Sequence, residues 1–214
     1  MQKLQDITNA VIAGKISETK ELVRGAVDAG IAAMQIINEG LAAGLEVVGD
    51  RFKTGEMFLA EMMLSATAAK VGIDLATENL DKGEYQPRST MVLGTIKGDL
   101  HDIGKNLVAL VLGSRGFKVI DLGVNVHEDE FISAVREHKP GFLGMSCLMT
   151  TTMKNMKDIM DALAEAGFRD IVKVVVGGCP VSQDFASQIG ADGYARNAGE
   201  VIDLMERLLA ETRD

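Results

Sequence analysis

Apolar side chains recur every three or four residues through the first part of the chain, a spacing typical of amphipathic helices. Leu4 and Ile7 begin this pattern. Gly14, Gly30 and Gly55 interrupt it, and glycine readily adopts the left-handed conformation that ends a helix. Short turns of this kind pack successive helices as antiparallel neighbours. The pattern therefore predicts a four-helix bundle, with helices at residues 2–13, 17–29, 32–54 and 58–80.

The pattern changes after this bundle. Residues 81–89 are polar and contain Gly83 and Pro87, which indicates a linker. Short apolar runs then alternate with amphipathic stretches of helical length, and this alternation is typical of a parallel sheet covered by helices on both faces. Strands are expected at residues 90–95, 118–121, 142–146, 171–176 and 193–195, and a last helix at 198–210. We predict an all-α domain at residues 1–84 and, at residues 85–214, a flavodoxin-like (Rossmann-like) α/β domain with a five-stranded parallel sheet.

Charge and composition exclude several classes of partner. The 214 residues carry a formal net charge of -9 with no basic cluster, which argues against a nucleic-acid partner. No window approaches the roughly 20 apolar residues of a membrane span, and the first residues lack the features of a signal peptide, so we expect a cytoplasmic protein without a membrane partner. Cys147 and Cys179 have no metal-type spacing and are expected to be free thiols.

Candidate chemistry lies in three loops that follow predicted strands. Ligands of doubly wound sheets bind beyond the carboxyl ends of the strands, and all three loops fall at that edge. The first loop is KGDLHDIGKN at residues 97–106, the second is SCLMTTT at 146–152, and the third is GGCP at 177–180.

These loops resemble the cobalamin-binding domain of methionine synthase and the corrinoid proteins that serve methanol and methylamine methyltransferases. The family pattern is Asp-x-His-x-x-Gly, then Ser-x-Leu, then Gly-Gly, each after its own strand. The matching residues are Asp99, His101, Gly104, Ser146, Leu148, Gly177 and Gly178. Three motifs in the expected order are far more specific than any one of them.

The resemblance implies that His101 is the lower axial ligand of cobalt, and thus the metal ligand. It also implies that Asp99 orients the imidazole, because a metal-bound histidine needs a partner on its other ring nitrogen. Thr152 matches a hydroxyl residue that extends this relay. These three residues are the expected catalytic groups.

The same resemblance implies a slot for the dimethylbenzimidazole tail of cobalamin. Ser146 would hydrogen-bond the tail and Leu148 would form an apolar wall. Glycines at 104, 177 and 178 would let the tail approach the backbone closely. Further cofactor contacts are expected in the same loops, from Asp102, Ile103 and Thr150.

In the helical half, residues 44–63 resemble the segment of methionine synthase that caps the upper corrin face. Phe52 and Leu59 match its capping pair, with Gly55 at the turn between them. Met62 would also line the corrin. Periodicity alone would assign Phe52 and Leu59 to the core of the bundle.

By resemblance, the function is that of a carrier that takes a methyl group on cobalt, with methylcobalamin as the loaded form. The partners would be a substrate-specific methyltransferase for a methylamine, quaternary amine or methanol, an acceptor methyltransferase using tetrahydrofolate or coenzyme M, and a reductive activator. The chain is too short to hold either methyltransferase as well. Two alternatives stay open: a cobalamin-dependent regulator or sensor, and the small subunit of an adenosylcobalamin mutase.

Overall fold

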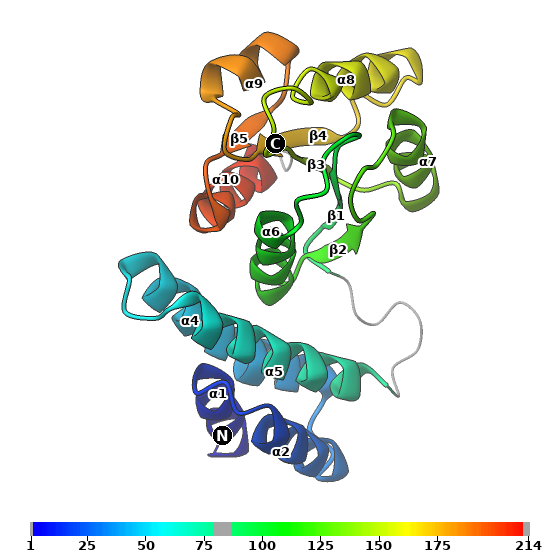
Figure 1. The fold of residues 1–214 in the computed structure, drawn as a ribbon. Coiled ribbons are helices and arrows are strands. Elements are labelled where there is room, and N and C mark those ends of the chain that lie inside the picture. The colour runs from blue at the N-terminus through cyan, green and yellow to red at the C-terminus, as the bar shows by residue number, and fades with distance from the viewer. Residues whose placement is uncertain (1, 79–86, 212–214) are drawn as a thin grey trace. The chain divides into compact units, whose positions relative to one another are not determined.

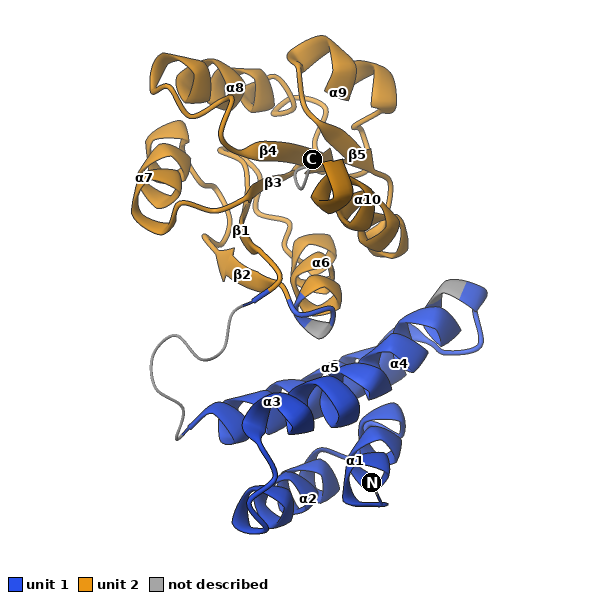
Figure 2. Cartoon of the chain, turned by 180° about the vertical axis from the view of Figure 1, so that it is seen from behind, with its two compact units in different colours: residues 1–87, 113–116 blue, residues 88–112, 117–214 orange. Residues whose placement is uncertain are grey.

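The computed structural model describes residues 2–78 and 87–211. The chain divides into two compact units, which Figure 2 shows in blue and orange. The helical unit comprises residues 1–87 and 113–116, and the sheet unit comprises residues 88–112 and 117–214. Residues 79–86, which include the last two residues of the fourth predicted helix and most of the predicted linker at 81–89, lie outside the described residues.

The helical unit confirms the predicted helical fold, with one local difference. The third predicted helix is α-helical at both ends but has a π-helical segment, η1, in its middle. Gly40 in this segment and Gly44 just after it lie close to Ile7 and Val11 of α1. Thr8 of α1 contacts this segment, since its hydroxyl lies 3.0 Å from the carbonyl oxygens of both Leu4 and Gly40. The elements are α1 (Gln2–Ile12), α2 (Ile16–Asp28), α3 (Ala33–Gln35), η1 (Ile36–Ala42), α4 (Ala43–Thr54) and α5 (Leu59–Thr77).

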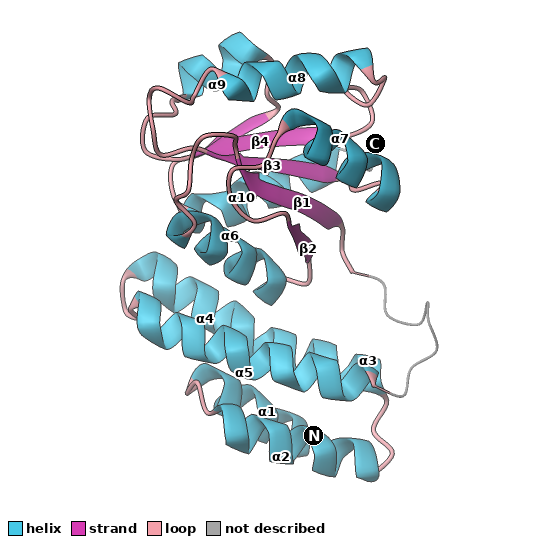
Figure 3. Ribbon diagram, turned by 45° about the vertical axis from the view of Figure 1, so that its right-hand side comes forward, coloured by secondary structure: helices cyan, strands magenta, loops and turns pink. Residues whose placement is uncertain are grey.

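The sheet unit is the predicted five-stranded parallel sheet, in the order β2-β1-β3-β4-β5. Helices α6 and α10 lie on one face and α7, α8 and α9 on the other (Figures 1 and 3). The strands are β1 (Thr90–Thr95), β2 (Lys118–Asp121), β3 (Phe142–Ser146), β4 (Lys173–Gly177) and β5 (Gly193–Ala195). The helices are α6 (Ile103–Ser114), α7 (Glu128–His138), α8 (Asn155–Glu165), α9 (Gln183–Ile189) and α10 (Ala198–Glu211).

The predicted start of the fourth strand is wrong by two residues. Ile171 is 69% exposed, and its N–H and that of Val172 both donate to the carbonyl of Phe168 in the turn after α8. The ladder begins only at Lys173, whose N–H donates to the carbonyl of Gly141. An apolar side chain next to a strand was therefore mistaken for part of it.

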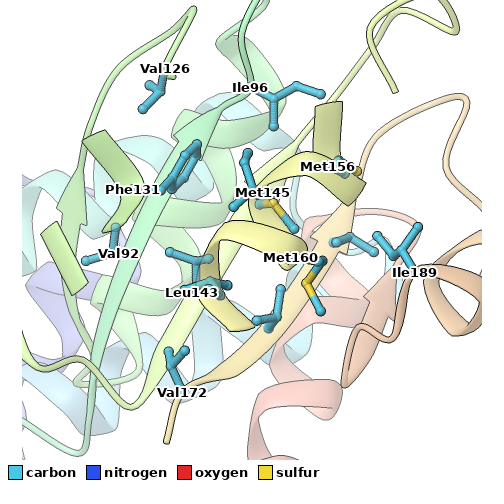
Figure 4. Close-up of a cluster of buried hydrophobic side chains, with 14 of the residues drawn as sticks. Val92, Ile96, Val126, Phe131, Leu143, Met145, Met156, Met160, Val172 and Ile189 are labelled. Carbon is cyan, nitrogen blue, oxygen red and sulfur yellow. The ribbon is translucent and has the colours of Figure 1, made fainter. Parts of the chain in front are cut away.

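A buried apolar cluster fixes the sheet against α7 and α8. Leu143 of β3, Phe131 of α7 and Met156 of α8 are fully buried in this cluster, and Figure 4 labels all three. Gly94 allows β1 to approach α7 closely, since a Cβ at this position would lie 2.8 Å from the ring of Phe131. This packing holds the carboxyl ends of β1, β3 and β4 at one edge. None of the described helices combines the length and apolar character that crossing a membrane requires.

Candidate functional site

The parallel register brings the three motif loops together. Thr95, Ser146 and Gly177 are paired across the last rung of β1, β3 and β4. Beyond that rung, the N–H of Ile96 donates to the carbonyl of Ser146, and the N–H of Cys147 donates to the carbonyl of Gly177. The loops that follow these strands therefore leave the sheet side by side.

His101 and Asp99 form a pair at this edge. The Nδ1 atom of His101 lies 2.7 Å from Oδ1 of Asp99, and the same oxygen accepts the backbone N–H of His101 at 3.0 Å. The other oxygen, Oδ2, accepts the N–H of Leu148 at 2.6 Å. The carboxylate is fully buried, whereas the His101 side chain is 55% exposed.

These hydrogen bonds stabilise the charged carboxylate. Burial alone would raise the pKa of Asp99, but the backbone N–H groups of His101 and Leu148, together with the imidazole, outweigh burial and lower that pKa below its ordinary value. An ionised Asp99 can only accept a hydrogen bond, so the ring proton of a neutral His101 lies on Nδ1 and Nε2 keeps a lone pair. This is the arrangement that a metal-ligating histidine requires.

The hydroxyl of Thr152 contacts Cys147 and not Asp99. It donates to the carbonyl of Met149 at 3.0 Å and lies 3.4 Å from the sulfur of Cys147. Burial raises the pKa of the Cys147 thiol, and the negative charge of Asp99 raises it further. Hydrogen bonds with Thr152 and Met149 lower this pKa but do not outweigh burial. A neutral thiol therefore lies near Asp99, and the relay role of Thr152 stays a prediction.

A cavity of about 480 Å³ opens on the face of the sheet that α6 and α10 cover. Met91, Leu93 and Val175 contribute to its largely apolar lining. Ser146 lines it too, is only 9% exposed, and its hydroxyl makes no hydrogen bond with another described residue. A ligand in the cavity could therefore accept a hydrogen bond from this hydroxyl.

The three motif glycines give this cavity its shape. A Cβ at Gly104 would meet nothing within 4 Å, so it would project into open space. Gly177 approaches the carbonyl of Ala195, which a Cβ would meet at 2.8 Å. Gly178 has a φ of +121°, and a Cβ there would lie 1.8 Å from the carbonyl oxygen of Cys147. An apolar slot lined by the Ser146 hydroxyl fits a heteroaromatic group that offers a hydrogen-bond acceptor.

Exposed apolar side chains flank His101 in its own loop and also occur in the loop after β3. Leu100 and Ile103 are 72% and 79% exposed, and Leu148 and Met149 are both 39% exposed. A large apolar ligand above the histidine would cover these side chains. Two other predicted contacts, Asp102 and Thr150, are also exposed in these loops.

The predicted cap residues lie around the turn between α4 and α5. Gly55 ends α4 with a φ of 79°, and the N–H of Phe58 donates to the carboxylate of Glu61 at the start of α5. Phe52 is half-buried, Leu59 is 37% exposed and Met62 is buried. Their role in covering a corrin stays a prediction.

Sequence reasoning missed the loop after β2. The N–H of Asn125 donates to the carbonyl of Asp99 at 2.9 Å, and its side-chain oxygen accepts the N–H of Gly98 at 2.7 Å. Lys105 of α6 is buried and donates to Asp121 at the end of β2. No motif marks Asn125, and the one signal in the sequence is an asparagine next to a strand end at the expected edge.

Comparison with known proteins agrees with this geometry. Two family models described as B12 binding domains match the chain, one over residues 89–203 and the other over residues 3–77. A corrinoid protein of Desulfitobacterium hafniense is 39% identical over 99% of each chain. The trimethylamine corrinoid protein of Methanosarcina barkeri is 44% identical over 86% of this chain and 85% of its own length.

Solved structures give the same result. A chain of the methanol:cobalamin methyltransferase complex from Methanosarcina barkeri superposes with a TM-score of 0.91 at 33% identity, over 98% of this chain and 80% of that one. A cobalamin-binding protein from Desulfitobacterium hafniense gives a TM-score of 0.74 at 29% identity, over 95% and 97% of the two chains.

Proposed function

Because the chain belongs to the family of B12-binding corrinoid proteins, we propose that it carries a methyl group on cobalt between two methyltransferases. Membership of this family shows that the chain binds cobalamin. The observation that carries the proposal is the ionised Asp99 hydrogen-bonded to Nδ1 of His101, beside a slot of suitable size. Bound cobalamin supplies a cobalt centre that accepts and releases a methyl group.

The residues of the sheet unit would hold the cofactor in two ways. His101 would ligate cobalt through Nε2, with Asp99 fixing the ring and increasing its basicity. The slot would take the nucleotide tail, where the Ser146 hydroxyl would donate to a ring nitrogen and Gly104 would leave room for the base. The exposed apolar residues around His101 would lie against the corrin and exclude water from the cobalt.

The partners are inferred from relatives. Proteins 39–44% identical to this chain are named trimethylamine, dimethylamine and monomethylamine corrinoid proteins, and a solved relative is part of a methanol:cobalamin methyltransferase complex. We therefore propose a substrate-specific methyltransferase for a methylamine as the donor enzyme, with methanol or a quaternary amine as other donors. An acceptor methyltransferase using tetrahydrofolate or coenzyme M and a reductive activator complete the proposed system.

Two further points of the sequence analysis stay predictions. Similarity to carriers along most of the chain supports the carrier role over a regulator or a mutase subunit. The cytoplasmic location also remains an expectation from the sequence.

The test uses the full chain reconstituted with hydroxocobalamin and reduced chemically. It is mixed in turn with methyltransferases for mono-, di- and trimethylamine and for methanol, each with its substrate, and the absorption spectrum of the corrinoid is followed. The proposal predicts substrate-dependent methylation of the bound corrinoid with at least one enzyme and none with His101→Ala. Failure to retain cobalamin, or equal methylation of free cobalamin and of the loaded protein, would contradict it.

A further inference from the structure

The segment that carries His101 has no helix or strand of its own. Residues 97–102 lie between β1 and α6, so neighbouring elements must hold their backbone in place. The hydroxyl of Thr95 donates to the carbonyl of His101 at 2.8 Å, and the amide of Asn155 donates to the carbonyl of Lys97 at 2.9 Å. These contacts fix the two ends of the segment.

Asn125 fixes its middle. Its backbone N–H donates to the carbonyl of Asp99, and its side-chain oxygen accepts the N–H of Gly98. Asn125 therefore binds two successive residues of the segment. Asn125 has a φ of 55°, and Lys139 is the other non-glycine residue with a positive φ in the described part of the chain. Asparagine tolerates this conformation better than most residues.

Asn125 is itself held from both sides. Before it, Asp121 is paired with Lys105 and accepts the N–H of Gly123. After it, the N–H of Val126 donates to the carbonyl of Thr95 at 2.9 Å. The loop after β2 is therefore tied to β1 and α6, the two elements that flank the His101 segment.

We propose that Asn125 is a positioning residue for the axial ligand. By binding Gly98 and Asp99, it fixes the backbone from which the Asp99 carboxylate reaches His101, and so sets where Nε2 lies. Asn125 touches neither the cavity lining nor the imidazole in the contacts of the described residues, so its effect passes through Asp99. The inference rests on the proposed role of His101 as the cobalt ligand.

The test measures the dissociation constant of the full chain for aquacobinamide, a corrinoid without the nucleotide tail. Retention of this probe depends on axial ligation and not on the slot, so damage to the slot does not change it. Asn125→Gly keeps the backbone N–H and the positive φ but removes the side-chain acceptor. Asn125→Asp retains an acceptor oxygen and serves as the conservative variant. Lys139→Gly is the matched control, because it relieves the same backbone conformation at the far end of α7.

We expect Asn125→Gly to weaken aquacobinamide binding by about fivefold, the effect of one lost hydrogen bond, while Asn125→Asp and Lys139→Gly stay within about twofold of wild type. Equal affinity of Asn125→Gly and wild type, or an equal loss in Asn125→Asp, would overturn the inference. The variant His101→Ala distinguishes the role of His101 as the cobalt ligand from the positioning role of Asn125. If it binds as wild type does, the axial role of His101 fails and the inference fails with it; if it binds weakly while Asn125→Gly does not, only the inference fails.

Discussion

Replacing Asp99 by asparagine tests the centre of the site with the smallest change of shape. The carboxylate accepts hydrogen bonds on both oxygens, from Nδ1 and N–H of His101 on one and from the N–H of Leu148 on the other. An amide offers only one oxygen. Whichever way it is turned, its NH₂ group faces a backbone N–H, of His101 or of Leu148, that has no other acceptor in the described contacts.

The cost follows from these contacts. If the oxygen faces His101, the N–H of Leu148 loses the acceptor that the fully buried carboxylate provides. If the oxygen faces Leu148, the NH₂ group donates to Nδ1, the ring proton moves to Nε2, and ligation is lost. A hydrogen bond to a charged group contributes about 1.5–3 kcal/mol, and an unsatisfied buried group costs about 1–3 kcal/mol, so we expect a loss of about 2–4 kcal/mol from the sheet unit.

Native-state hydrogen exchange of the cofactor-free protein measures this loss. Peptides from β1 and β3 report the unfolding of the sheet unit separately from the helical unit. The control is Asp161→Asn, which removes an exposed carboxylate paired with Lys157 one helical turn away and should cost at most about 0.5 kcal/mol. A loss no larger than that of the control in Asp99→Asn would refute the hydrogen-bond argument.

Three further predictions follow from the described contacts. Gly178→Ala should destabilise the sheet unit far more than Gly190→Ala in thermal melts, because both have positive φ but only the Cβ at 178 would collide with backbone; equal melting temperatures would count against this. Thr8→Val should cost the helical unit about 1–2 kcal/mol by hydrogen exchange, since Gly40 in the π-helical segment loses its hydroxyl donor, and an unchanged exchange rate would argue against that role. Folding lowers the pKa of Asp99 below its ordinary value of 3.8, so the stability that the carboxylate contributes is fully present above that pH and is lost as the pH falls through the lower folded-state pKa. The stability of Asp99→Ala, measured in acid unfolding, should lack this pH dependence. Parallel plots of stability against pH for the variant and the wild type would contradict the prediction.

The architecture of the sheet unit could be predicted because its apolar runs are short and buried. All five residues of β3 are buried, and a run of this length between turn signals indicates a strand. The start of β4 was misjudged because Ile171 is apolar yet exposed. The π-helical segment could not be predicted from the apolar spacing, because it covers only seven residues within a longer helical stretch.

The pairing of Asp99 with His101 was expected from the motif, because two residues in one tight loop can meet. Contacts between distant loops were harder to predict. Asn125 reaches Gly98 only through the parallel pairing of β1 with β2, and the residues of the loop after β2 do not reveal this contact. The position of Cys147 next to Thr152 likewise depends on how the loop after β3 turns.

The most direct measurement of the central claim is the electron paramagnetic resonance spectrum of the Co(II) form of the reconstituted protein, prepared with ordinary and with 15N-labelled histidine. An axial nitrogen of ordinary isotope splits each cobalt line into three, whereas 15N splits it into two. If His101 ligates cobalt, labelled histidine converts the triplets into doublets. The His101→Ala variant then shows neither the triplets nor the doublets that arise from histidine nitrogen. Triplets that persist in the labelled protein would mean that the axial nitrogen comes from elsewhere, and would contradict the account.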